Sequence, residues 1–412
     1  MERPIGGVFM VKRVVDVAVV GAGIVGLGIA WMTVKSGRTV AVIDPAPASG
    51  ATYAAAGMLA PVSELHYGEE DLLELMLASA ALYPAFVETL GGAETGYRRT
   101  RTITVGVDAA DRQSLVDLRQ IQLRHGLTVE PLTIREARSF EPLLNPQLSS
   151  AFSIEQDHQV DPRLLAGHLQ TAIAAAAAEN NGIADHVIQQ NAVALLHRNP
   201  ADAASRATGV VLADGTTVTA NEVIVANGLA AAQLDGLPAW LLLRLRPVYG
   251  DILRLRVPQH LRPLLTATIR GLVRGLPVYL VPRTDGTVVL GATQREDGSA
   301  AVSAGAVHQL LRDAQVLVPA VAELELIEVT ARARPATPDN APLLGRVARG
   351  PSQCGDIPGL IIATGFFRHG VLLTPITAQH CVRLMDGMAD DRWARFRPDR
   401  FSSPASKESA RD

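Results

Sequence analysis

The sequence predicts an α/β fold with two parts: a domain that is built on a parallel sheet and split along the chain, and a second domain with an antiparallel sheet flanked by helices. Two observations predict it. A strand, a glycine turn and a helix follow one another near both ends of the chain, at 14–36 and 359–385. Between them, residues 248–291 alternate apolar and polar side chains as antiparallel strands do. Segments of the second domain are therefore expected to interrupt the first.

Length and composition narrow the class of protein. The chain has 412 residues, 48% hydrophobic and 19% charged, which predicts two or three domains and excludes disorder for most of the chain. A net charge of −3 without a basic run argues against nucleic-acid binding. Cys354 and Cys381 are the only cysteines and stand in no metal or redox spacing. We therefore expect a reduced, cytoplasmic protein without bound metal.

An uncharged stretch at 17–34 just reaches the length of a membrane-spanning helix. Four glycines interrupt it, at positions 21, 23, 26 and 28, and a β-branched run precedes them. This order is typical of a strand that enters a turn. We therefore expect no membrane insertion and no export.

The remaining elements follow in order. A strand at 14–20, a helix at 24–36 ended by Gly37 and a strand at 39–43 form a βαβ unit. Asp161 before Pro162 is typical of a helix start, and Asp214-Gly215 of a hairpin turn. Further helices are predicted at 69–90, 162–180 and 304–317, and a helical pattern extends over 110–145. Strands are predicted at 100–107, 192–196, 208–212, 222–226, 248–255, 278–282, 287–291 and 324–334.

The first turn has the pattern of a dinucleotide site. Gly21-Ala22-Gly23-Ile24-Val25-Gly26 follows a strand and opens a helix, so the backbone can approach a pyrophosphate at the helix N-terminus. Asp44 ends the second strand, where an acid can bond a ribose hydroxyl. The pattern predicts a Rossmann-like domain but does not separate NAD from FAD. The small, apolar segment 52–61 is either a loop that packs on the cofactor or an ordinary buried turn.

Several further motifs occur in one order. They are Ala54-Ala55-Ala56-Gly57-Met58-Leu59, Arg246-Pro247-Val248-Tyr249-Gly250, Tyr279-Leu280-Val281-Pro282-Arg283, Gly291-Ala292-Thr293, Arg334-Pro335 and Ala363-Thr364-Gly365-Phe366-Phe367-Arg368-His369-Gly370. Together with the first turn, they resemble the D-amino acid oxidase family of flavoproteins, and more narrowly its glycine oxidase branch associated with thiamine biosynthesis. The resemblance covers nearly all of 14–398.

The resemblance implies noncovalent FAD and the oxidation of a small amine or amino acid by oxygen, with hydrogen peroxide as by-product. It implies that Arg334 pairs with the substrate carboxylate, that Tyr279 supports it, and that Arg368 lies near the flavin. A planar guanidinium suits the first role because it grips a carboxylate through two parallel hydrogen bonds. The implied cofactor-binding residues are Gly21, Gly23, Ile24, Val25, Gly26, Asp44, Thr52, Ala55, Ala56, Gly57, Met58, Val193, Gly228, Gly365, Phe367, Arg368, His369, Gly370, Val371 and Leu372.

These inferences divide the chain into segments. The FAD-binding domain is expected to comprise 14–90, 151–235 and 335–398, and the substrate domain 91–150 and 236–334. The polar ends, 1–13 and 399–412, are expected to be disordered.

The substrate stays open at this stage. Pro277 and Gln294 stand where the compared glycine oxidases have His and Met, so the pocket is expected to be roomier and more polar. The resemblance implies a homo-oligomer that supplies glycine imine for the thiazole of thiamine. The alternatives are a D-amino acid dehydrogenase, a sarcosine oxidase, or a flavin-binding regulator without turnover.

Overall fold

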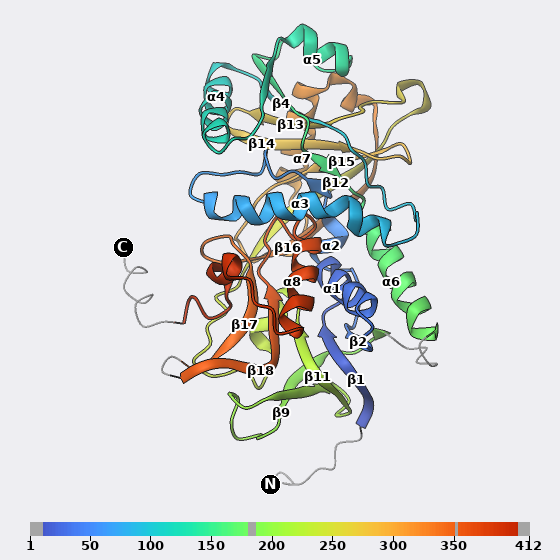
Figure 1. Ribbon diagram of the computed structural model, residues 1–412. Coiled ribbons are helices and arrows are strands. Elements are labelled where there is room, and N and C mark those ends of the chain that lie inside the picture. The colour runs from blue at the N-terminus through green and yellow to red at the C-terminus, as the bar shows by residue number, and fades with distance from the viewer. Residues whose placement is uncertain (1–10, 180–186, 351–352, 403–412) are drawn as a thin grey trace. The chain divides into compact units, whose positions relative to one another are not determined.

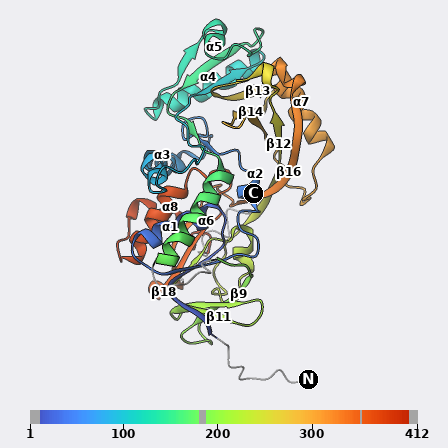
Figure 2. The same ribbon diagram turned by 90° about the vertical axis from the view of Figure 1, so that its right-hand side faces the viewer.

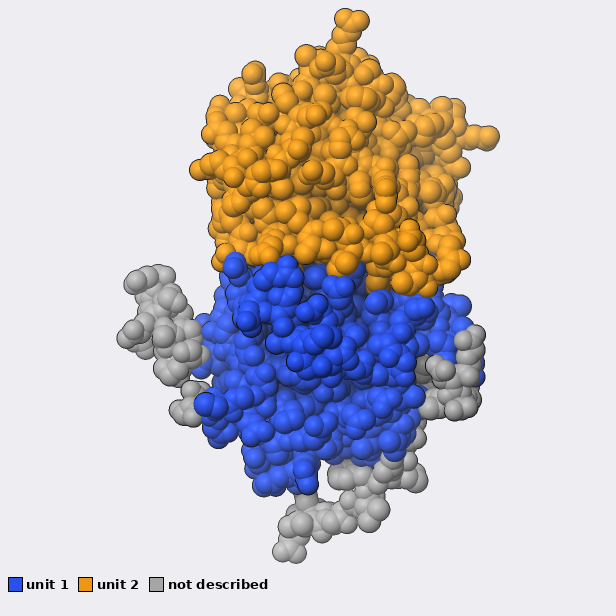
Figure 3. All heavy atoms as spheres, in the orientation of Figure 1, with its two compact units in different colours: residues 1–49, 166–246, 335–412 blue, residues 50–165, 247–334 orange. Residues whose placement is uncertain are grey.

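The computed structural model describes residues 11–179, 187–350 and 353–402 (Figure 1). The chain divides into two compact units, coloured in Figure 3. Unit 1 comprises 1–49, 166–246 and 335–412, and unit 2 comprises 50–165 and 247–334. Three elements contain a boundary between the units, namely α6 (Pro162–Glu179), β12 (Arg246–Arg256) and β16 (Glu325–Ala336).

Unit 1 is built on a mixed sheet whose centre is parallel. Its central strands lie in the order β18 (Gln353–Thr364), β11 (Thr217–Val225), β1 (Val11–Val20) and β2 (Val40–Ile43), and each adjacent pair is parallel. At the sides, β8 (Val187–Ile188) pairs with β2, β17 (Leu343–Gly350) with β18, and the hairpin β9 (Ala192–His197) and β10 (Ala207–Leu212) with β11. Gly215 closes the predicted turn between β10 and β11 with a φ of +83°.

Helices cover this sheet because its strands are apolar on both sides. The β-branched side chains of Val19, Val223 and Ile361 are all fully buried. Helix α1 (Ile24–Lys35) and helix α8 (Thr374–Met385) lie side by side (Figure 2), while the short helices η2 (Gly228–Gln233) and η5 (Asp391–Phe396) follow β11 and α8. This is the strand-turn-helix arrangement predicted for both ends of the chain.

Unit 2 contains an eight-stranded, largely antiparallel sheet, as predicted. Its order is β16, β12, β15 (Thr287–Gly291), β14 (Leu276–Pro282), β13 (Thr268–Val273), β4 (Thr102–Gly106), β6 (Ser150–Ile154) and β5 (Glu130–Leu132), with β13 and β4 parallel. The other elements are α2 (Ala51–Ala54), α3 (Leu73–Glu88), α4 (Ala109–Arg124), α5 (Ile134–Phe140), α7 (Ala304–Leu317), η1 (Glu70–Leu72), η3 (Gln259–Leu261), η4 (Pro319–Glu323), and the pair β3 (Met58–Leu59) and β7 (His158–Gln159).

The two faces of this sheet differ in chemistry. One face buries a large apolar core in which Leu253, Leu280 and Leu290 pack with Leu310 of α7. The other face holds a smaller cluster that includes Ile252, Val281 and Val289 with the half-buried Tyr279. Because side chains alternate along a strand, Tyr279 lies on the same face of β14 as Val281.

Several expectations from the sequence are wrong in detail. The span 110–145, expected to be helical, contains α4, β5 and α5, because Gly126 adopts a φ of +74° after α4 and β5 then pairs with β6. Strands β3, β6, β7, β8, β13 and β17 were also not predicted. At the ends, residues 11–13 belong to β1, and Asp399 accepts a hydrogen bond from the backbone of Ala348. The rest of the two ends expected to be disordered, 1–10 and 403–412, lies outside the described residues.

The unit boundaries also differ from the expected segments. Residues 50–90 and 151–165 fall in unit 2, and 236–246 in unit 1. The reason is long-range pairing: β3 pairs with β7, and the backbone of Gly57 accepts a hydrogen bond from Val160 at 2.9 Å. None of the described helices is long and apolar enough to cross a membrane.

Candidate active site

Four loops of unit 1 meet at one edge of its sheet. The parallel strands β1, β2, β11 and β18 end there, and the segments that follow them contain Gly21–Gly26, Asp44, Gly228 and Gly365. Open α/β sheets bind ligands at the carboxyl ends of their strands, where the strand order reverses. The structure therefore brings these sequence-predicted cofactor residues together.

The glycine turn packs so closely on its surroundings that side chains at two of its positions would collide with backbone atoms. A Cβ atom on Gly21, whose φ is +106°, would lie 2.5 Å from the carbonyl oxygen of Ala226, and one on Gly26 would lie 2.0 Å from that of Gly21. Gly23 is the N-cap of α1 and provides no side-chain cap. The N-terminus of α1 therefore begins directly at the glycine turn, as in pyrophosphate sites.

Asp44 fixes the shape of this turn. Its Oδ2 accepts a hydrogen bond from the backbone amide of Ala22 at 2.7 Å, and its Oδ1 accepts one from Ala46 at 2.8 Å. A carboxylate has about four acceptor positions, so the half-buried side chain retains acceptor capacity for a ribose hydroxyl. The turn, the helix N-terminus and this acid together fit the dinucleotide part of FAD.

The segment after β18 packs beside the glycine turn. A Cβ on Gly370 would lie 4.0 Å from Cγ2 of Val25, which places the two motifs next to each other. Gly365 and Phe367 have φ values of +72° and +47°, and the Phe367 amide donates to the carbonyl of Pro335 at 2.8 Å. Arg368 is half-buried with its guanidinium 5.3 Å from the ring centre of Phe367, while the neighbouring residues His369, Val371 and Leu372 are buried.

Gly228 and Val193 differ in their placement. The carbonyl of Gly228 accepts a hydrogen bond from the Thr364 hydroxyl at 2.9 Å and so joins the ends of β11 and β18. Val193 lies on β9, in the hairpin that pairs with the first half of β11, and its carbonyl accepts from the Asp235 amide at 3.0 Å. A contact between Val193 and the adenine stays a prediction.

In unit 2, the predicted cofactor segment 52–58 is held by an arginine that the sequence argument left without a role. Arg283 donates to the carbonyls of Ala56 at 2.5 Å and Val160 at 2.9 Å, and it pairs with Asp161. Burial lowers the pKa of Arg283 to about 10, so the side chain stays charged at neutral pH. The available signal was its position, because Arg283 directly follows β14 and lies four residues after Tyr279 in the sequence.

Thr52, Ala55, Gly57 and Met58 lie in or beside this segment. Thr52 is buried in α2, Ala55 is its C-cap, and Met58 packs at the apolar cluster of the second face. Gly57 has a φ of +72°, and a Cβ there would stand 2.0 Å from the carbonyl oxygen of Val160. A larger residue at position 57 is therefore excluded by the fold of unit 2 itself.

The two residues predicted to bind substrate lie over two strand glycines. A Cβ on Gly250 would lie 2.3 Å from Nη2 of Arg334, and a Cβ on Gly291 would lie 2.5 Å from the hydroxyl oxygen of Tyr279. Gly291 is the cross-strand partner of Tyr279, and β12 with Gly250 lies between β15 and β16. The two glycines thus form a floor on which the guanidinium and the phenol lie. A glycine inside a strand often signals such a close approach, although it does not name the group that approaches.

No carboxylate of the described residues forms an ion pair with Arg334, whose Nη1 donates to the carbonyl of Thr293 at 3.4 Å. Burial raises the pKa of Tyr279 above its ordinary value of 10, and nearby Arg334 opposes this only in part. Tyr279 is therefore a neutral donor beside a cation, a combination that can bind and orient a carboxylate.

A buried ion pair flanks Tyr279 on the next strand. Arg270 is the cross-strand partner of Tyr279, and its guanidinium contacts the carboxylate of Glu64. Close by, Asp157 accepts hydrogen bonds from the amides of Val62 at 3.1 Å and Ser63 at 3.2 Å. Burial raises the pKa of Asp157 to about 6. Sequence reasoning missed these residues, because no local pattern links positions so far apart.

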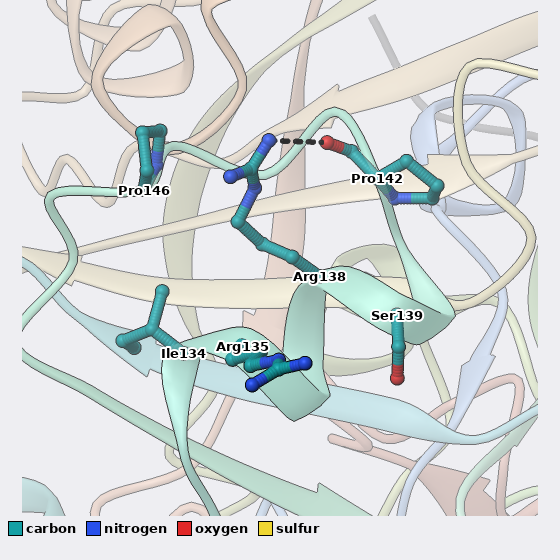
Figure 4. Close-up of a pocket in the computed structure, with 6 residues that line it drawn as sticks. All are labelled: Ile134, Arg135, Arg138, Ser139, Pro142 and Pro146. Carbon is teal, nitrogen blue, oxygen red and sulfur yellow. Dashed lines mark hydrogen bonds between the residues drawn. The ribbon is translucent and has the colours of Figure 1, made fainter.

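The two residues that depart from the glycine oxidase pattern are both exposed. Pro277 lies on β14, two residues before Tyr279 and on the same face, and Gln294 follows Thr293. A pocket beside α5 has a different location (Figure 4). It is lined by Ile134, Arg135, Arg138, Ser139, Pro142 and Pro146, and Arg138 donates to the carbonyl of Pro142. Strands β13, β4 and β6 separate β14 from β5, which precedes α5, so this pocket is not part of the Tyr279 and Arg334 site.

Comparison with known proteins gives a consistent result. Residues 16–384 match the family model described as FAD dependent oxidoreductase. The chain is 32% identical over 369 residues to a glycine oxidase of Geobacillus kaustophilus, covering 88% of this chain and 90% of that protein. It is 29% identical to the bifunctional protein ThiO/ThiG of Trichormus variabilis over 95% of this chain, but spans only 56% of the length of that relative.

Solved structures agree with the fold. The crystal structure of glycine oxidase from Geobacillus kaustophilus has a TM-score of 0.80 at 30% identity, covering 94% of this chain and 99% of that one. Iminodiacetate oxidase from Chelativorans sp. BNC1 has a TM-score of 0.78 at 27% identity, covering 93% and 99%. The predicted combination of a Rossmann-like sheet with a largely antiparallel sheet is thereby confirmed.

Proposed function

Because this chain belongs to the family of FAD-dependent oxidoreductases, we propose that it oxidises glycine or another small amine or amino acid, with oxygen as electron acceptor. The observation on which this rests is the pair of Arg334 and Tyr279 over Gly250 and Gly291. A cation with no acidic partner among the described residues, next to a neutral hydroxyl, suits a small carboxylate-bearing substrate.

The residues of unit 1 divide the binding of the cofactor among them. The first turn of α1 with Gly21, Gly23 and Gly26 receives the pyrophosphate, and Asp44 holds both this turn and the ribose. Neither cysteine is suited to a covalent link, since Cys381 is buried, where burial raises the pKa of its thiol to about 12, and Cys354 is exposed on β18. A covalent link through a cysteine is therefore not expected, which agrees with noncovalent binding of the cofactor.

The residues of unit 2 bind and orient the substrate. Arg334 takes the carboxylate through two parallel hydrogen bonds, and the Tyr279 hydroxyl donates a third. The apolar side chains of Ile252, Val281 and Val289 exclude water beside them. Bound FAD supplies a two-electron acceptor for the hydride of the substrate Cα, with imine and hydrogen peroxide as the final products. No protein base is needed if the amine arrives neutral, so positioning provides most of the acceleration.

Glycine is the first candidate substrate because relatives at about 30% identity include a glycine oxidase and a ThiO/ThiG protein. Glycine imine for the thiazole of thiamine is the corresponding product role. The exposed Pro277 and Gln294 favour some extra room, so we expect sarcosine or D-alanine to be oxidised at least as well as glycine. Bulky D-amino acids are expected to be poor substrates.

A substrate panel tests this proposal. Hydrogen peroxide formation is measured with glycine, sarcosine, D-alanine and D-phenylalanine, and kcat/KM is compared. A clear preference for D-phenylalanine would overturn the glycine-oxidase assignment in favour of a general D-amino acid enzyme. Reduction of the flavin without air, combined with an absence of oxygen consumption, would instead identify a dehydrogenase. No flavin reduction by any of these compounds would identify a binding protein without turnover.

A further inference from the structure

The Arg334 guanidinium contacts one neighbouring carbonyl. Within the described part of the chain, the polar contact of Arg334 is the bond from Nη1 to the carbonyl of Thr293 at 3.4 Å. Gly250 lies below the guanidinium and offers it only backbone surface. The Thr293 carbonyl is therefore the polar group of the described residues that contacts one edge of the Arg334 guanidinium.

Thr293 lies in an irregular segment after β15. Leu253 of β12 pairs with Leu290, while Tyr249 pairs with Arg295, so this segment has one residue more than the stretch of β12 opposite it. An extra residue of this kind bends a strand and re-aims its side chains and carbonyls. A bent segment needs other contacts to define its shape.

Asp251 provides those contacts. Its Oδ2 accepts hydrogen bonds from the Thr293 hydroxyl at 2.5 Å and from Nε of Arg295 at 2.9 Å, and its Oδ1 accepts one from the Ser303 amide at 3.2 Å. The Asp251 amide in turn donates to the Thr293 hydroxyl oxygen at 2.9 Å. Asp251 is fully buried, and the bonds from Arg295 and Thr293 nevertheless hold the pKa of its carboxyl below the ordinary value. Asp251 is therefore an ionised group that holds Thr293 and Arg295 of the bent segment in place.

We propose that Asp251 is a positioning residue that acts through Thr293 to hold the Arg334 guanidinium in its carboxylate-binding orientation. This rests on the proposed role of Arg334. Asp251 and Gly250 are neighbours on β12 and point to opposite faces, so one strand leaves the space for the guanidinium and also sets the carbonyl that aims it. Asp251 itself touches no substrate.

The test compares matched variants of the FAD-loaded enzyme. Asp251→Asn and Thr293→Val weaken the link between Asp251 and Thr293. Asp297→Asn is the control, because Asp297 is an exposed partner of the same Arg295 but has no bond to Thr293. Thr293→Ser is the second control, because it keeps the hydroxyl. Each variant is made alone and combined with Arg334→Ala, and KM and kcat for glycine, the inhibition constant of acetate, flavin content and Tm are measured.

We expect Asp251→Asn and Thr293→Val to raise KM for glycine and the inhibition constant of acetate by roughly 10-fold each, with kcat changed by less than about threefold. In the Arg334→Ala background, neither variant should raise these constants further, because residues that act through one another are not additive. Asp297→Asn and Thr293→Ser should stay within about twofold of the parent.

The possible failures are distinguishable. An equal rise of KM with and without Arg334 would mean that Asp251 supports the fold in general and does not position Arg334. An unchanged KM in Asp251→Asn would mean that packing alone orients the guanidinium. If Arg334→Ala itself leaves KM and the acetate constant unchanged, the proposed carboxylate site is wrong, and the positioning role fails with it.

Discussion

Gly250 and Arg334 lie so close together that a Cβ atom on residue 250 would stand 2.3 Å from Nη2 of Arg334 and 2.6 Å from its Cζ. The absence of a side chain at position 250 is therefore a condition for the observed place of the guanidinium. We predict that Gly250→Ala displaces Arg334 and raises KM for glycine by about 10-fold or more, with the flavin content unchanged. Steady-state kinetics with a flavin spectrum of each preparation measures both effects.

Gly305→Ala is the matched control for this substitution. Gly305 lies in α7, and a Cβ there would meet only Oγ of Ser303, at 3.8 Å. Alanine in a helix is favoured over glycine by about 1 kcal/mol, so this variant should be as active as the parent and slightly more stable. A Gly250→Ala enzyme with the parent KM would show that Arg334 does not contact the substrate.

Removal of the guanidinium itself should have a larger effect. We predict that Arg334→Ala raises KM for glycine by about 10- to 100-fold, because a charge-assisted pair contributes about 1.5 to 3 kcal/mol. Arg332→Ala is the control, since Arg332 is an exposed residue on the same strand. Equal kinetics of the two variants would indicate that the carboxylate binds elsewhere, with Arg368 as the next candidate.

The sequence predicted those features that depend on local pattern. Helix α7 spans the predicted residues 304–317 because its apolar spacing is regular and Ser303 caps it, accepting a bond from the Ala306 amide. The glycine turn and Asp44 were likewise found, because their spacing follows from the geometry of one βαβ unit.

The rest of the site depends on contacts between distant residues. Arg270 meets Glu64 across 206 positions, and Arg283 meets Ala56 across 227. Contacts between distant residues also place residues 50–90 in unit 2, although this segment follows soon after Asp44 in the sequence. A local sequence pattern does not show which distant residues pair. The glycines at 250 and 291 could be seen in the sequence, but not the side chains of Arg334 and Tyr279 that lie over them.

The glycine turn of unit 1 gives a prediction about cofactor content. A Cβ on Gly26 would lie 2.0 Å from the carbonyl oxygen of Gly21, so Gly26→Ala must separate α1 from the turn that precedes it. We predict loss of most bound FAD, measured as flavin absorbance per protein after gel filtration. Gly167→Ala is the control, because Gly167 lies in α6 with open space around its Cβ position. Full flavin content in Gly26→Ala would argue against this turn as the pyrophosphate site.

Two carboxyl groups of unit 2 should make the folding stability depend on pH in opposite directions. The bond from Arg163 to Glu328 lowers the pKa of Glu328 to about 2 from 4.5, whereas burial raises the pKa of Asp157 to about 6 from 3.8. Between pH 2 and 4.5 the unfolded chain binds more protons at Glu328, so this group adds stability as the pH rises. Between pH 3.8 and 6 the folded chain binds more protons at Asp157, so that group removes stability as the pH rises.

Over the pH range between its two pKa values, each carboxyl group is expected to change the free energy of unfolding by about 3 kcal/mol. Denaturant unfolding between pH 4 and 7 measures the Asp157 effect, and we predict that Asp157→Asn flattens the fall in stability over this range. The amide keeps the size of the side chain and can still accept a bond from Val62 or Ser63, so the folded structure is retained. Glu328→Gln should instead remove the stability gained between pH 2 and 4.5. An unchanged slope between pH 4 and 6 in Asp157→Asn would mean that Asp157 is ionised throughout this range, stabilised by Arg270 and the two amides.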